Sequence, residues 1–202
     1  MTSQECSMSE VTRTPVEIKS FVGLDLSLCS TGFSLKTGND IRVETIKSKP
    51  DNFPNDLARL KYIVAEVVRR IPKSVSMICL EDFFVPSSSF QVGSAIKIAM
   101  LGTAIRLALY DVGMPFFVVS PNSLKKHILG KGVGKKDLII REVYKKYGME
   151  VKDSDQADAL VLSCIAEQMS QALIGGMGDW PKYQKEVVAA LLEARKERGY
   201  NL

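Results

Sequence analysis

Histidine, paired cysteines and long apolar runs are scarce in this sequence of 202 residues, and each scarcity excludes a class of protein. His127 is the only histidine, which excludes a mechanism built on several imidazoles. The four cysteines lack CxxC spacing, which argues against a zinc site or a disulfide framework and fits thiols in a reducing compartment. Lys97, Arg106 and Asp111 interrupt the longest apolar stretch, so we expect no segment to span a bilayer.

The length suits one domain with a sizeable core, and the 46% hydrophobic and 25% charged residues are ordinary for a globular protein. Residues 1–19 are polar and have no apolar segment of a secretory signal, so we expect a loosely ordered N-terminal arm. We expect residues 20–174 to form the domain, and residues 175–202 a linker and a C-terminal helix packed on it.

Positive charge is concentrated in one segment of the chain. Residues 121–152 hold nine basic and three acidic side chains, whereas the whole chain has a formal net charge of +4. Such a segment favours a polyanionic substrate, although a solvated helical face would have the same composition.

The hydrophobic pattern predicts an α/β fold with a three-stranded antiparallel meander at its start. The expected strands are residues 21–25 and their hairpin partner up to 35, 41–46, 75–80 and 115–119. The expected helices are residues 56–71, 90–112, 121–128, 136–147, one that begins at 153 or 154, and 183–198.

Four acidic residues stand where these elements begin or end. Asp25 ends the first strand of the hairpin, at the edge of a buried sheet, where a charge costs several kcal/mol unless it is paired. Glu81 follows the strand at 75–80, and Asp155 and Asp158 share a face in the first turn of a helix. In a sheet-and-helix domain such ends can converge on one rim, so we expect the four side chains to share a site.

Four carboxylates in one cleft repel one another, because two unit charges ~4 Å apart cost about 4 kcal/mol at an effective dielectric constant of 20. Two divalent ions would reverse this cost, and hard oxygen ligands suit Mg²⁺ or Mn²⁺. A structural reading competes for each acid taken singly: a surface position, a salt bridge, or a helix start, where the dipole favours Asp155 and Asp158 without any metal.

Three motifs resemble those of the RuvC group of Holliday junction resolvases, within the RNase H-like nuclease superfamily. The resemblance covers roughly residues 21–168. It rests on GLDLSLCSTG around Asp25, on LEDFF around Glu81, and on DQADAL, which begins at Asp155 and includes Asp158. The resemblance implies an RNase H-like fold, with parallel strands added to the meander and helices flanking the mixed sheet.

The same resemblance implies a crossover junction endodeoxyribonuclease, a metal-dependent enzyme that resolves four-way DNA junctions by paired nicks. Two Mg²⁺ ions, replaceable by Mn²⁺, would be held by the four acids. Other members place two lysines near the scissile phosphate, where Lys125 and Lys136 lie here, and an aromatic side chain at the junction, where Phe84 lies. Lys131 and Lys135 add basic character, and with the C-terminal extension they point to a viral member.

Two other functions compete with this one. The hairpin motif also resembles the phosphate loop of sugar kinases and actin-like ATPases, but those proteins need two such lobes. A DNA-binding subunit without catalysis is the second alternative, and the presence of all four acids argues against it. For the resolvase we expect a cytoplasmic, DNA-associated protein, in the host cytoplasm if the source is viral.

The helix at residues 90–112 predicts a homodimer. Ile96, Met100 and Leu107 lie on one of its sides, while Ile105 and Leu109 lie on another with Ile98. One sheet can cover only one side, so the other needs the neighbouring helix at 56–71 or a second subunit. A two-fold dimer would suit a junction with two equivalent strands to cut, and the family resemblance implies it too.

Overall fold

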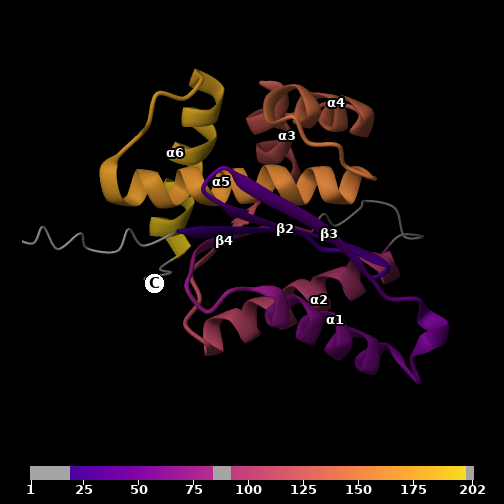
Figure 1. Ribbon diagram of the computed structural model, residues 1–202. Coiled ribbons are helices and arrows are strands. Elements are labelled where there is room, and N and C mark those ends of the chain that lie inside the picture. Colours follow the sequence, from indigo (N-terminus) through magenta and orange to yellow (C-terminus); the bar gives the residue numbers. More distant parts are fainter. Residues whose placement is uncertain (1–18, 84–91, 199–202) are drawn as a thin grey trace, which may run out of the picture.

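Five strands form one mixed sheet in the order β3-β2-β1-β4-β5. Figure 1 shows this sheet between two layers of helices. The structure is a computed structural model that describes residues 19–83 and 92–198. Antiparallel pairing joins three strands into the predicted meander: β1 (Ser20–Asp25), β2 (Ser30–Thr37) and β3 (Asp40–Lys47). β4 (Val75–Glu81) runs parallel to β1, and β5 (Phe116–Val119) runs parallel to β4.

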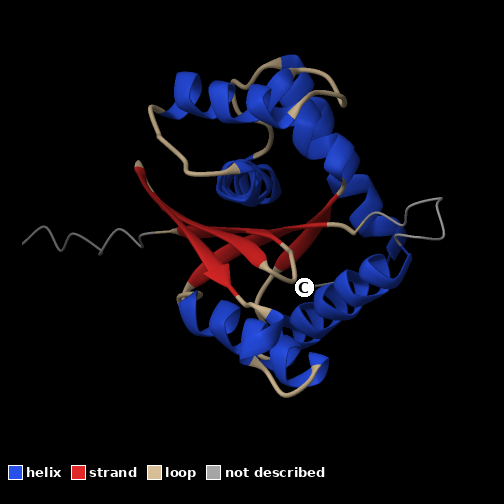
Figure 2. Ribbon diagram, turned by 90° about the vertical axis from the view of Figure 1, so that its right-hand side faces the viewer, coloured by secondary structure: helices blue, strands red, loops and turns tan. Residues whose placement is uncertain are grey.

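Helices cover both faces of this sheet, as Figure 2 shows. One face carries α1 (Asp56–Arg70) and α2 (Val92–Asp111), which follow the short 3₁₀ turn Pro50–Asn52. The other face carries α5 (Ser154–Gly175), with α3 (Pro121–Leu129), α4 (Lys136–Tyr147) and α6 (Lys182–Arg198) packed around it.

Alternation along the strands divides the core into two layers. Val22 and Leu24 of β1 are fully buried on the side of α1 and α2, whereas Phe21 is buried on the side of α5. Asp25 shares the parity of Phe21, and in β4 Glu81 shares that of Cys79, which is also buried beneath α5. The strand period therefore directs both acids toward α5.

Capping residues explain where several of the helices begin and end. Asn55 caps α1 by accepting from Ala58 N, and Ser120 caps α3 by accepting from Ser123 N. Gly148 ends α4 in the left-handed conformation that glycine favours. Asp153 caps α5, because its Oδ1 accepts from Gln156 N at 2.9 Å, and the helix begins at Ser154.

Helix α2 departs from one sequence expectation. By length and composition residues Gly93–Asp111 could cross a membrane, despite the charges within them, although a core helix passes the same test. Leu101, Ile105 and Leu109 are fully buried in the layer beneath the sheet, and Lys97 pairs with Asp56 of α1 at 2.8 Å. These contacts indicate that α2 packs on the core of the protein as a core helix does.

Candidate active site

The carboxyl ends of β1 and β4 bring Asp25 and Glu81 side by side. The parallel register pairs Leu24 with Leu80, so the next residue of each strand is one of the two acids. Their carboxyl groups share a hydrogen bond, and Asp25 is buried. Two acids in such contact hold one proton between them, or need a cation.

Two glycines bring the start of α5 onto this pair. A Cβ added to Gly23 of β1 would lie 1.9 Å from the carbonyl oxygen of Ala159, and one added to Gly32 of β2 would lie 2.1 Å from that of Asp155. Real side chains cannot approach backbone this closely, so both positions require glycine. Gly32 also pairs across the meander with Asp25, which places the first turn of α5 above the acid.

Burial and mutual repulsion raise the pKa of three of the four acids. The pKa of Asp158 rises to about 7, because the group is buried and faces Asp25 and Asp155. Burial also raises the pKa of Asp25, with Glu81 and Asp155 adding to the effect, and that of Glu81, with Asp158 adding to it. The four predicted acids therefore lie within electrostatic reach of one another, as expected from the sequence.

This negative charge fits a divalent cation. Oδ1 of Asp158 is buried and has no hydrogen-bond partner among the described residues, and all the donors are carboxylate oxygens, the ligands that Mg²⁺ and Mn²⁺ prefer. In the described ranges no three His, Cys, Asp or Glu side chains already stand close enough to enclose an ion. The four-carboxylate metal site therefore stays a prediction.

Asp155 does not cap the helix. Asp153 fills that role, while Asp155 accepts a hydrogen bond from Ser154 Oγ at 3.3 Å and raises the pKa of Asp25 and Asp158. Asp155 also lies in the first turn of α5, where the helix dipole favours an acid without any metal, so its role as a metal ligand stays a prediction.

Two of the four predicted lysines lie beside the acids. Lys125 of α3 and Lys136 of α4 both lower the pKa values of Glu81 and Asp158, against the effect of burial. Lys136 Nζ also donates to Ser154 Oγ at 3.1 Å. Lys131 and Lys135 are exposed around the loop between α3 and α4, and they are not among the main charges acting on these carboxyls.

The predicted aromatic contact with DNA falls on Phe84, which lies outside the described residues. Its neighbour Phe83 is half-buried. The guanidinium carbon of Arg106 lies 5.7 Å from the centre of the Phe83 ring, so α2 fixes the chain just beyond Glu81.

Arg59 of α1 is a residue that the sequence analysis missed. Its guanidinium group is buried and donates to the carbonyl oxygens of Leu28 at 2.6 Å and Ser48 at 2.9 Å. These bonds fix the hairpin loop that follows Asp25. A lone arginine in an amphipathic helix carries no sequence signal for such a role, whereas glycine inside a strand, as at positions 23 and 32, does signal a close approach.

The model of the family "Crossover junction endodeoxyribonuclease RuvC" matches residues 21–167 of this chain. The chain belongs to this family. The RuvC protein of the bacterium Rhizobium johnstonii is 30% identical over 172 residues, which cover 76% of this chain and 96% of the relative. The family is dependent on divalent metals and its members are nucleases, so the predicted enzyme class of crossover junction endodeoxyribonuclease is confirmed.

Two solved structures show a related fold. The RuvC structure from Thermus thermophilus has a TM-score of 0.61 at 20% identity and covers 78% of this chain and 98% of its own. The same protein in complex with a Holliday junction substrate has a TM-score of 0.59 at 19% identity, with coverage of 79% and 98%. The predicted RNase H-like fold of the RuvC group is thereby confirmed.

Proposed function

We propose that this RuvC-family nuclease resolves four-way DNA junctions by paired nicks, with Asp25, Glu81, Asp155 and Asp158 as ligands of two Mg²⁺ ions. The observation that carries the proposal is the convergence of four carboxyl groups from β1, β4 and α5, three of them with raised pKa values. Mn²⁺, another hard divalent ion, should substitute.

The protein groups at the site have separable roles in this reaction. Asp25, Glu81, Asp155 and Asp158 would hold the divalent ions, which would supply an activated water and charge stabilisation for the leaving 3′ oxygen, so each nick would leave a 5′ phosphate. Lys125 and Lys136, whose charges already act on the acids, would hold the scissile phosphate against them. Lys131 and Lys135 would contact phosphates farther along the strand, and Phe84 would stack on a base at the junction.

The exposed side of α2 supports a homodimer. Ile96, Met100, Leu107 and Tyr110 follow one another at helical spacing, and their exposed fractions lie between 46% and 63%. Helix α1 packs against α2 without covering these residues. We infer that a second copy covers this stripe, which would place two sites against two strands of one junction. Such an enzyme would act on DNA in the cytoplasm, that of the host if the source is viral.

Cleavage of labelled DNA tests the proposal. The purified protein with Mg²⁺ should nick opposite strands of a four-way junction at matching positions and leave ends that DNA ligase can reseal. Linear duplex of the same sequence should stay intact, and EDTA should stop the reaction. Binding of the junction without any cleavage in Mg²⁺ or Mn²⁺ would instead indicate a DNA-binding subunit, and phosphate transfer from ATP to a sugar would indicate the kinase-like alternative.

A further inference from the structure

A closed ring of three hydrogen bonds joins the helices α3, α5 and α6. His127 Nε2 of α3 donates to Gln168 Oε1 of α5 at 2.8 Å, and Gln168 Nε2 donates to Gln184 Oε1 of α6 at 2.9 Å. Gln184 Nε2 completes the ring by donating to the main-chain oxygen of His127 at 3.3 Å. Gln184 is buried and Gln168 is half-buried, and amide groups bonded in this way favour one arrangement of the helices, because each would lose its partners if a helix moved.

The ring provides a hydrogen-bond partner for the last turn of α3, the helix that carries Lys125. The last four carbonyl oxygens of an α-helix have no partner within the helix, and His127 O is one of these in α3. Gln184 provides its partner from α6. Helix α3 is only nine residues long, and Lys125 lies two residues before His127, so the position of this lysine depends on how the short helix is held.

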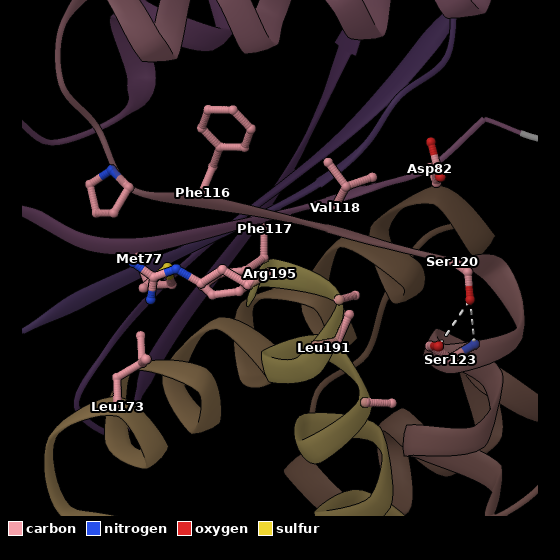
Figure 3. A pocket seen from close by; sticks show the side chains of 13 residues that line it. Met77, Asp82, Phe116, Phe117, Val118, Ser120, Ser123, Leu173, Leu191 and Arg195 are labelled. Atoms are coloured by element: carbon pink, nitrogen blue, oxygen red, sulfur yellow. Dashed lines mark hydrogen bonds between the residues drawn. The ribbon is translucent and has the colours of Figure 1, made fainter. Parts of the chain in front are cut away.

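The first half of α6 packs against α3. Val187 and Val188 are buried in the core layer that also holds Leu124 and Ile128 of α3, and Lys126 pairs with Glu186 at 2.7 Å. The other half of α6 stands beside a cavity of about 260 Å³. Figure 3 shows that Leu191 and Arg195 of α6 line this cavity together with β5, and the guanidinium carbon of Arg195 lies 5.6 Å from the centre of the Phe117 ring. Helix α6 therefore contacts α3 through its first half and β5 through its second half.

Both glutamines of the ring lie outside the stretch that matches the family, which ends at residue 167. We infer that Gln184, in the C-terminal extension, is a positioning residue that holds Lys125 of α3 against the reacting phosphate. The inference rests on the proposed role of Lys125. The C-terminal extension would then take part in the reaction. It would connect α3, which supplies the cation Lys125, to α5, which supplies two of the acids.

A double-mutant cycle with single-turnover cleavage of a four-way junction tests this inference. Gln184→Met keeps the length and apolar bulk of the side chain but removes its hydrogen bonds. We expect the cleavage rate at saturating enzyme to fall by between about 10- and 100-fold, the scale for a misplaced catalytic group, with junction affinity changed less than about twofold. In the Lys125→Ala background the same substitution should change the rate by less than about twofold.

Leu191→Ala is the matched control, since it loosens the other half of α6 beside the cavity without touching the ring. It should lower the melting temperature at least as much as Gln184→Met while keeping the cleavage rate within about twofold of wild type. Equal rate losses from Gln184→Met in the two backgrounds, an unchanged rate in the wild-type background, or a matching loss in Leu191→Ala would overturn the inference. Full activity of Lys125→Ala would overturn both the inference and the proposed role of Lys125.

Discussion

At the scale of single residues, the acids of the candidate site lower the stability of the folded protein when no metal is bound. Asp158 is buried with one oxygen unpaired, and its pKa rises from the ordinary 3.8 to about 7. The folded protein therefore binds this proton more tightly than the unfolded chain does, so stability is lost as the pH rises from about 4 to about 7. Above pH 7 the folded state bears the full cost of the buried charge, at most about 4 kcal/mol for a shift of this size.

Asp158→Asn removes this cost. In EDTA at pH 8 we expect the variant to melt several degrees higher than wild type, and at pH 4 the two should melt alike, because both are then neutral at this position. Mg²⁺ should raise the melting temperature of wild type more than that of the variant. Thermal melts across this pH range provide the measurement. Asp153→Asn, which keeps a good capping residue, is the control and should show no gain at pH 8; a variant no more stable than wild type at pH 8 would contradict the account.

At the scale of elements, the decisive contact is the approach of α5 to β1 and β2. Gly32→Ala would put a methyl group 2.1 Å from the carbonyl oxygen of Asp155, so the helix start must move. We expect a loss of about 1–3 kcal/mol in stability, typical of overpacking, and a larger fractional loss in cleavage, because Asp155 and Asp158 move with the helix. Chemical unfolding and single-turnover cleavage measure the two effects.

Gly93→Ala in α2 is the matched control for that substitution, because its added Cβ meets nothing within 4 Å. It should leave both stability and cleavage near wild type or slightly raise stability. A Gly32→Ala protein that cuts at the wild-type rate would show that α5 need not lie so close to the sheet.

The basic segment should divide into two functional pairs. Each lysine that contacts a phosphate should reduce the slope of log affinity against log salt by about one unit when changed to alanine. Lys125 and Lys136, beside the acids, should also slow cleavage, whereas Lys131 and Lys135 should affect binding only. Binding titrations at several salt concentrations would test this, with exposed Lys61 of α1 as the control. If the slope were unchanged when all four lysines are replaced by alanine, the basic segment would be a solvated surface that does not contact DNA.

Local signals explain what the sequence could predict at this scale. Asn55, Ser120 and Gly148 set helix ends through their own backbone neighbours, so the predicted boundaries agree closely with the structure. Gly32 meets a partner more than a hundred residues away, and Gln184 bonds to one more than fifty residues away. A local hydrophobic pattern cannot predict contacts between residues so far apart in the sequence. The four acids were predictable because strand and helix ends meet at one rim in this kind of fold.

At the scale of the whole molecule, the exposed stripe on α2 predicts a dimer that cuts in pairs. Leu107→Glu should give a particle of one chain at micromolar concentration, because a charge in an apolar interface is costly. That variant should nick one strand at a time and resolve few junctions. Light scattering and strand-specific labels provide the measurements. Ile174→Glu, at an exposed apolar residue on α5, is the control and should stay a dimer.

Mixed dimers give a second test of the same assembly. Wild-type subunits mixed with excess Asp25→Asn subunits should leave single nicks without resolution. A wild-type mass of one chain, with junction bound and cutting intact, would contradict the dimer.

Single-turnover cleavage by four carboxylate variants tests the central claim most directly. Asp25→Asn, Glu81→Gln, Asp155→Asn and Asp158→Asn each remove ligand charge with little change in shape. Each should lose roughly 100-fold or more in junction cleavage with Mg²⁺, since metal ions supply several kcal/mol to such a reaction. Junction binding should be equal or tighter, because less negative charge repels phosphate less, and Asp153→Asn should cut normally. If two or more of the four variants cut near the wild-type rate, these carboxylates are not the metal centre.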